Sequence, residues 1–253
     1  GDVRRNALSD FTNVRANGKI AMDLPDNVAL VNARIATQDD DVMLVTKSGR
    51  AIRFSTNAVR VFKGRKSTGV RGVRLTGDDC VVSMSILRHF EASSDERAAY
   101  LKMRRAVAGM VDDEGAGTED EEVSANATIS PERYAEMSAA ENLILTISSR
   151  GSGKLSSSHD YPVRGRGGMG VAAMDKAMRG GDLVASFPVD LEDQIMLATS
   201  KGQSIRVPIE GISFRSRSAG GVKVFNTGNN EEVVSVARIV EQSEEEEAPQ
   251  SEA

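Results

Sequence analysis

Two stretches of the chain follow one order of features. Residues 40–86 read DDVMLVTKSGRAIRFSTNAVRVFKGRKSTGVRGVRLTGDDCVVSMSI, and residues 192–239 read EDQIMLATSKGQSIRVPIEGISFRSRSAGGVKVFNTGNNEEVVSVARI. Each begins with acidic residues and a four-residue apolar run, then passes through a Gly turn into a second run that carries Arg. A polar loop with Ser and Gly, a third apolar run, an acidic turn and a final VVSM or VVSV run follow. Short β-branched runs between such turns are typical of antiparallel strands, so we predict two copies of a four-stranded unit.

Two further copies are visible. Residues 142–187 follow the same order, and residues 1–35 follow it if the first strand is missing. We place the first turn of the four copies at Gly1, Gly49, Gly153 and Gly202, and the second turn at Gly18, Gly69, Gly170 and Gly220. Because the chain starts as if in mid-domain and without Met, we expect an N-terminally truncated fragment.

A repeat of about 50 residues with four short strands indicates propeller blades, because one blade cannot bury its apolar faces alone. We therefore predict an all-β fold, a β-propeller or β-pinwheel of four-stranded blades over residues 1–240. The blades are expected at approximately 1–35 (partial), 40–86, 142–187 and 192–239.

An acidic segment, 88–141, separates the second copy from the third. It holds 13 Asp or Glu and 6 Lys or Arg. Residues 93–109 and 130–141 have helix-start signals, a capping box from Ser93 and an N-cap at Ser130, so we predict a helical insertion. The acid-rich stretch 111–122 and the acidic tail 241–253 are predicted to be disordered, and we expect both to compete with a polyanion for basic surfaces.

Charge is segregated along the chain. The net charge is −5, yet the insertion contributes −7 and the tail −6, so the rest of the chain carries +8. A basic body with acidic appendages is the pattern of a polyanion-binding protein. Aromatic residues are only 4% and Trp is absent, which argues against base-stacking platforms.

The stretch RGRGGMG (164–170) contains the spacing G-x-G-x-x-G of a dinucleotide-binding turn. That site needs an apolar strand before the glycines and a helix after them. Here SSSHDYPV precedes and VAAM with a turn follows, and in the repeat the stretch corresponds to 13–19, 64–72 and 215–221. We therefore interpret it as one of four equivalent basic loops.

These loops combine glycine with cations. Glycine lets backbone N–H groups approach a phosphate, while Arg and Lys bind its oxygens. If the blades are radial, the loops form a basic belt that suits the backbone of a bent duplex without reading its bases. The candidate DNA-binding residues are Arg15, Lys19, Arg65, Lys66, Arg71, Arg74, Arg164, Arg166, Arg215, Arg217 and Lys223.

Other chemistry has little support in the sequence. Cys80, the single cysteine, lies in the apolar run DDCVVSMSI and is expected to be a buried thiol. His89 and His159 have no metal-ligand spacing, and no catalytic triad or carboxylate pair recurs, so we predict no catalytic or metal site. The opening GDVRRNALSD is unlike a signal peptide and no run is long enough to span a membrane, so we expect a cytoplasmic protein.

Several stretches resemble the C-terminal domain family of the DNA gyrase A protein. They are DVMLVTKSGRAIRF, STGVRGVRL, DQIMLATSKGQSIRV, VVSVARI and FTNVRANGKIAMDL. The resemblance implies a six-bladed β-pinwheel, in which blades exchange a strand and DNA wraps the basic rim with positive handedness to support negative supercoiling. The nearest match to the family box Q-R-R-G-G-K-G is RGRGGMG, where Arg164, Gly165 and Met169 replace Gln, Arg and Lys.

The resemblance also implies a non-catalytic part of an ATP-dependent type II topoisomerase. The partners would be double-stranded DNA, the gyrase B protein and a second gyrase A protein in an A2B2 heterotetramer. No cofactor is expected in this chain, since ATP and Mg²⁺ would serve the partner proteins. Tyr100, Tyr134 and Tyr161 are not in the context of the catalytic Tyr. The C-terminal domain of the topoisomerase IV A protein and a protein-interaction propeller remain alternatives.

Overall fold

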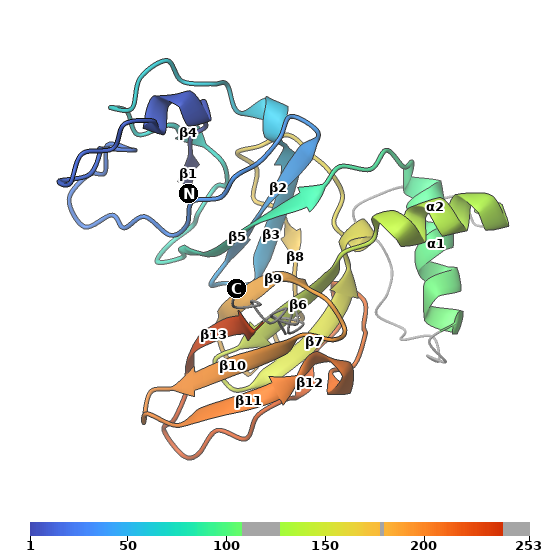
Figure 1. Cartoon of the computed structure of the whole chain (residues 1–253). Helices are drawn as coiled ribbons and strands as arrows, with labels where there is room; N and C mark the ends of the chain where they lie inside the picture. Colours follow the sequence, from blue (N-terminus) through green and yellow to red (C-terminus); the bar gives the residue numbers. More distant parts are fainter. Residues whose placement is uncertain (108–126, 178–179, 240–253) are drawn as a thin grey trace, which may run out of the picture.

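Three of the four units are built on a β-hairpin (Figure 1). The computed structural model describes residues 1–107, 127–177 and 180–239. The hairpins are β2 (Asp40–Thr46) with β3 (Arg50–Ser55), β6 (Leu143–Ser148) with β7 (Ser152–Ser157), and β10 (Gln194–Thr199) with β11 (Ser204–Pro208). A glycine with φ between 74° and 89° closes each hairpin, a conformation that a side chain would disfavour. These glycines are Gly49, Gly151 and Gly202.

A third strand pairs antiparallel with the other side of each hairpin's first strand. These strands are β5 (Val81–Arg88), β9 (Leu183–Val189) and β13 (Val233–Ile239). Each pairing has a register shift at the same place, next to Thr46, Ser148 and Thr199. The recurrence of the bulge shows that the units repeat in backbone geometry as well as in sequence.

Each unit after the first contributes a short strand to the sheet of the unit before it. β8 (Val171–Ala172) pairs with β3, β12 (Val222–Lys223) pairs with β7, and β4 (Val70–Arg71) pairs with β1 (Asp2–Val3). The resulting sheet orders are β5-β2-β3-β8 and β12-β7-β6-β9, while the last unit has β11-β10-β13. This exchange between four-stranded sheets confirms the predicted β-pinwheel.

The pairing corrects the predicted register at two glycines. Gly151 closes the β6–β7 hairpin of the third unit, whereas Gly153 lies inside β7, and Gly221 rather than Gly220 precedes the exchanged strand. The spacing of the repeat does not distinguish between the two glycines of SRGSG, or between those of the pair 220–221. Only the strand pairing shows which glycine occupies the turn position.

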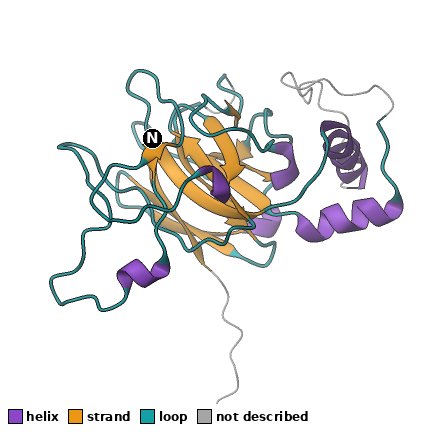
Figure 2. Cartoon of the chain, turned by 90° about the horizontal axis from the view of Figure 1, so that it is seen from above, coloured by secondary structure: helices purple, strands orange, loops and turns teal. Residues whose placement is uncertain are grey.

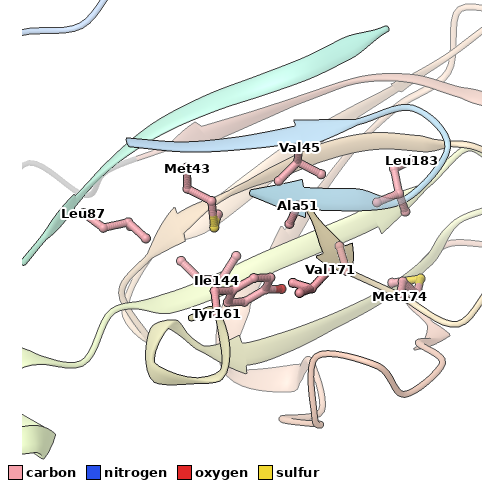
Figure 3. Packing of buried hydrophobic residues seen from close by; sticks show 10 residues of the cluster. Met43, Val45, Ala51, Leu87, Ile144, Tyr161, Val171, Met174 and Leu183 are labelled. Atoms are coloured by element: carbon pink, nitrogen blue, oxygen red, sulfur yellow. The ribbon is translucent and has the colours of Figure 1, made fainter. Parts of the chain in front are cut away.

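The units stack through apolar side chains. One cluster joins the sheet of β2 and β3 to that of β6 and β9, with Met43, Ile144 and Tyr161 among its fully buried members (Figure 3). A second cluster, which includes Leu145 and Leu197, joins the third unit to the fourth. These two clusters bury apolar faces of neighbouring sheets against each other, as expected for blades.

The first unit has little regular structure. Besides β1 it contains the 3₁₀ turn η1 (Leu8–Phe11), and residues 28–35 align with β5, β9 and β13 but form no strand. Those three strands all pair with the first strand of a hairpin, and the described part of this unit holds no such strand. Val28, Leu30, Val31 and Ile35 are consequently exposed, each by at least 51%.

Two helices form the insertion after β5. They are α1 (Ser94–Val107) and α2 (Pro131–Ala140), and Figure 2 shows them to one side of the sheets. The predicted caps are present: Ser93 and Glu96 bond each other's backbone N–H, and the Ser130 hydroxyl accepts from the Arg133 N–H. Stretches 111–122 and 241–253 lie outside the described residues. No described helix has the length and hydropathy of a membrane span.

The expectation for Cys80 was wrong. Cys80 is exposed, in the turn before β5 begins at Val81. The Asp79 carboxylate accepts hydrogen bonds from the Cys80 and Ser48 backbone N–H groups at 3.0 and 2.8 Å. These bonds hold Cys80 beside the acidic turn, so the strand begins at Val81, one residue later than the apolar run indicated.

Candidate nucleic-acid interface

The basic loops lie at the boundaries between units. Each follows a short 3₁₀ turn: η2 (Thr56–Ala58), η3 (Ser158–Asp160) or η4 (Ile209–Gly211). A single parallel bridge joins each loop to the preceding unit, at Arg5–Val61, Arg53–Val163 and Leu155–Phe214. Each loop then ends in the exchanged strand, so its side chains are positioned by two units at once.

The glycine that ends each loop is required by packing. A Cβ on Gly69 would lie 2.4 Å from the Val3 carbonyl oxygen, and one on Gly170 would lie 2.3 Å from that of Ala51. A Cβ on Gly221 would lie 2.8 Å from the Gly153 nitrogen. The sequence pattern predicts that these glycines let a phosphate approach the backbone, but contact with the neighbouring strand accounts for them without a ligand.

Three of the candidate arginines occupy one equivalent position, four residues before that glycine. Their guanidinium groups bond carbonyls of the preceding unit. Arg166 donates to the Ala58 and Arg71 oxygens, both at 2.9 Å, and Arg217 donates to the corresponding oxygens of Asp160 and Ala172 at 2.9 and 2.8 Å. Arg65 donates to the Ile20 oxygen at 2.9 Å. These arginines therefore connect consecutive loops.

Arg217 differs from its two counterparts in burial. It is 5% exposed, its Nε lies 3.7 Å from an Asp160 carboxylate oxygen, and its backbone N–H donates to the other oxygen at 2.5 Å. Arg166 is exposed and Arg65 is half-buried. A guanidinium enclosed in this way cannot reach a phosphate, so we leave Arg217 out of the interface.

The two candidate lysines near glycine turns also bond the protein. Lys19 donates to the carbonyl oxygens of Asp10 and Thr12, and Lys223 donates to that of Arg150 at 3.0 Å. Lys223 is nevertheless exposed, so its ammonium keeps donors that face solvent.

The remaining candidates lie on the surface to different extents. Arg15, Lys66, Arg71, Arg74 and Arg164 are exposed, and Arg215 is half-buried. Arg164 and Arg215 are equivalent, because their backbone N–H groups donate to the Arg53 and Leu155 oxygens at 2.8 and 2.7 Å. The structure thus brings exposed cations to several unit boundaries.

Sequence reasoning missed other cations of the same loops. Arg60 is exposed and stacks on the Phe62 ring, with its guanidinium carbon 4.1 Å from the ring centroid, and Lys63 is also exposed. The Arg4 guanidinium carbon lies 4.8 Å from the same centroid. The run VRVFKGRK carried the signal for Arg60 and Lys63, since it alternates basic and apolar residues directly before the loop.

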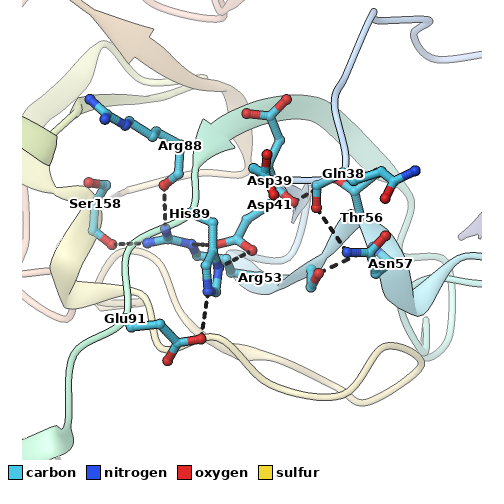
Figure 4. Close-up of polar contacts among 12 residues, drawn as sticks. Gln38, Asp39, Asp41, Arg53, Thr56, Asn57, Arg88, His89, Glu91 and Ser158 are labelled. Carbon is cyan, nitrogen blue, oxygen red and sulfur yellow. Dashed lines mark hydrogen bonds and ion pairs between the residues drawn. The ribbon is translucent and has the colours of Figure 1, made fainter.

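A polar network lies under the middle loop (Figure 4). The buried Asp41 carboxylate accepts from the Arg53 Nε at 2.8 Å and contacts the His89 Nδ1 at 2.9 Å, while the His89 Nε2 contacts Glu91 at 2.9 Å. Arg53 also donates to the Ser158 and Arg88 oxygens. The bond to Glu91 raises the pKa of His89, and desolvation lowers the pKa of Arg53 despite Asp41.

The other histidine has a structural environment. His159 is buried, its Nε2 lies 2.8 Å from the Met137 oxygen, and the Tyr100 ring packs edge-on at 5.0 Å. Burial lowers the pKa of His159. Within residues 1–107, 127–177 and 180–239, no group of three His, Cys, Asp or Glu side chains is arranged to hold a metal ion.

Repeated sheets that exchange a strand, with cationic loops at their boundaries, define a β-pinwheel of the propeller class. The family described as DNA gyrase C-terminal domain, β-propeller, matches residues 3–37, 40–88, 142–187 and 193–239. The chain therefore belongs to the DNA gyrase C-terminal domain family.

The curated relatives are the A proteins of DNA gyrase. That of Granulibacter bethesdensis is 45% identical over 95% of this chain, and that of Haemophilus influenzae is 31% identical over 99%. The chain spans 27% and 26% of their respective lengths. These matches identify a C-terminal domain of the gyrase A type and do not favour the topoisomerase IV alternative.

Two solved structures share the fold. A DNA gyrase A C-terminal domain has a TM-score of 0.64 at 21% identity, covering 95% of this chain and 63% of that one. A DNA topoisomerase IV C-terminal domain has a TM-score of 0.67 at 18% identity, covering 94% of this chain and 59% of that one. At these identities the likeness concerns the fold alone.

Proposed function

We propose that this chain binds duplex DNA along its basic loops and wraps it. The observation that carries the proposal is the recurrence of exposed cations at the boundaries between units, on loops of one backbone design. The net charge of +8 outside the insertion and tail supports it, as does membership of the gyrase family. Successive boundaries would give successive phosphate contacts, which bend a duplex around the body.

The contacts expected are with phosphates. Lys66, Arg71, Arg74 and Arg164 offer exposed cationic ends, and Arg15, Lys19, Lys223, Arg65, Arg166 and Arg215 add further cations, most of which also bond the protein. Phosphate contacts position a duplex without reading its sequence, so binding should show little sequence preference. Wrapping of positive handedness, as in the resembling family, would present a DNA segment for negative supercoiling.

In the whole protein this domain would serve an ATP-dependent type II topoisomerase. We propose that strand passage is performed by other parts of that enzyme, with the gyrase B protein and a second gyrase A protein in an A2B2 assembly. ATP and Mg²⁺ would act on those partners, and this chain would need no cofactor. The cytoplasm, where the chromosome lies, would be its location.

The decisive experiment combines binding with topology. In the full-length protein, the triple variant Lys66→Ala, Arg71→Ala, Arg74→Ala should lower the slope of log Kd against log salt by about 2.7, at about 0.9 for each phosphate contact. Lys102→Ala on α1 is the control for loss of a cation elsewhere, because it removes one exposed charge outside the loops and should leave the slope unchanged.

Religation of relaxed circular DNA on the protein tests wrapping itself. Wild type should shift the linking number and the triple variant should shift it less. If wild type binds DNA no better than a neutral protein, or binds without any change in linking number, the proposal is wrong.

A further inference from the structure

A buried lysine holds the last basic loop from beneath. The Lys154 side chain is fully buried, and its ammonium donates to the carbonyl oxygens of Ser216, Arg217 and Ala219 at 2.8, 2.5 and 2.7 Å. Lys154 belongs to β7 of the third unit, whereas the three carbonyls belong to the loop of the fourth. An ammonium has three donors, so this one is fully used by the loop.

Arg4 makes the same contacts at an earlier boundary. Its guanidinium donates to the Arg65 and Ser67 oxygens at 2.8 and 2.7 Å and also to the Gly64 oxygen. In both loops the acceptors lie five, four and two residues before the glycine that ends the loop. Arg4 and Lys154 are also equivalent in the sheets, each two residues after the first residue that pairs with the exchanged strand.

The middle boundary lacks such a cation. Ile52 occupies the equivalent place and lies beneath Gly168. There the loop is fixed by other bonds: the Gly167 N–H donates to the Gly72 oxygen at 2.6 Å, and the Gly168 oxygen accepts from the Arg74 N–H at 2.8 Å. The fold therefore accepts an aliphatic side chain at this position. A cation is needed only beneath the two loops whose carbonyls it bonds.

We propose that Lys154 is a positioning residue for DNA binding, which holds loop 212–221 in the shape that presents Arg215 and Lys223. Arg4 does the same for the loop that carries Lys66 and Arg71. The proposal rests on the proposed function, and it makes each contact loop dependent on the unit before it. Because Lys154 has no exposed surface, it cannot touch a phosphate, and it acts on DNA only through the loop.

Burial of the Lys154 charge costs free energy. Packing alone therefore does not account for a lysine at this position. Desolvation lowers the pKa of Lys154 to about 7, the Asp160 carboxylate opposes this shift, and the neighbouring Arg217 adds to it. A methionine would fill the same space without that cost. The chain has instead a donor for each inward-facing carbonyl of the loop.

Amide hydrogen exchange tests the positioning step without DNA. In the full-length protein, Lys154→Met should make exchange in residues 213–221 about tenfold faster, since three carbonyls lose their donors. Residues 163–170 serve as the internal control and should be unchanged. Lys154→Arg should restore slow exchange, because a guanidinium fills this role at Arg4. Unchanged exchange in Lys154→Met would overturn the proposal.

A second variant guards against a global effect. If Lys154→Met loses its fold, Arg4→Met decides, with residues 62–69 as the reporting segment and 213–221 as the control. Faster exchange confined to 62–69 supports the proposal, and equal exchange in both variant and wild type contradicts it.

DNA binding tests the consequence. Lys154→Met should lower the slope of log Kd against log salt by about 1.8, the value of two phosphate contacts at about 0.9 each. Lys201→Met, which removes an exposed lysine of the last hairpin turn, is the matched control. Faster exchange with an unchanged slope would refute the positioning role. If wild type itself fails to bind DNA, the proposed function fails while the exchange result stands.

Discussion

Loops 162–170 and 212–221 follow one path with different chemistry. Both attach to the preceding unit through a parallel bridge and through the backbone N–H of Arg164 or Arg215. The middle loop is rich in glycine, rests on Ile52 and leaves Arg166 exposed. The last loop encloses the Lys154 ammonium and buries Arg217 against Asp160. The same backbone design can therefore direct its cations to the protein or present them to solvent.

The largest expected effect concerns the glycine that ends the middle loop. Gly170 has φ +73°, and a Cβ there would meet the Ala51 backbone. Gly170→Ala should lower the free energy of unfolding by about 3–5 kcal/mol, from left-handed strain together with overpacking. Gly165→Ala, with nothing within 4 Å of the added carbon, should change it by less than about 0.5 kcal/mol. Urea unfolding compares them, and similar midpoints would mean that the two units do not pack as described.

The equivalent arginines should differ in the same measurement. Arg217→Ala should cost about 3–5 kcal/mol, because it leaves the Asp160 carboxylate without its buried partner. Arg166→Ala removes bonds to two corresponding carbonyls from an exposed site and should cost less than about 1 kcal/mol. Equal losses of stability would contradict the distinction between a buried and a surface arginine.

DNA affinity should depend on the exposed cations rather than on the buried ones. Arg164→Ala removes an exposed cation of the middle loop, so the salt slope of binding should fall by about 0.9. Arg164→Lys keeps the charge and should retain most of the slope. Fluorescence anisotropy over a range of salt concentrations measures both, and an unchanged slope in Arg164→Ala would exclude this loop from the interface.

The smallest effect is the pH dependence of the network under the middle loop. The bond to Glu91 raises the pKa of His89 above its ordinary value of 6.5, so the folded state holds the proton more tightly. The added stability is complete below that ordinary value and is lost as pH rises through the raised pKa. Because His89 is partly exposed, we expect less than about 1 kcal/mol. His89→Gln should flatten this part of the stability profile, measured by urea unfolding, and an equally steep profile would assign the dependence to other groups.

Sequence patterns were sufficient for the repeat, the strands of the last three units, the helix caps and the basic loops that precede the exchanged strands. Alternating apolar runs and turn residues are local signals, and their recurrence identified the blades. The patterns were wrong for Gly153, Gly220 and Cys80, where neighbouring residues offered the same chemistry and only strand pairing selects between them. They also grouped Arg217 with Arg166, because the residues next to an arginine in the sequence do not show whether its side chain is buried.

The repeated sheet units and their basic loops can be predicted from the amino-acid sequence, because the repeat period and the turn residues are local features of the chain. Which cations bond the protein and which face solvent depends on the packing of the units. Lys154 and Arg4 bond loops about 60 residues away in sequence, across a boundary created by strand exchange. Whether a cationic side chain is buried or exposed depends on the carbonyls and carboxylates that folding brings close to it. No local sequence pattern identifies those partners.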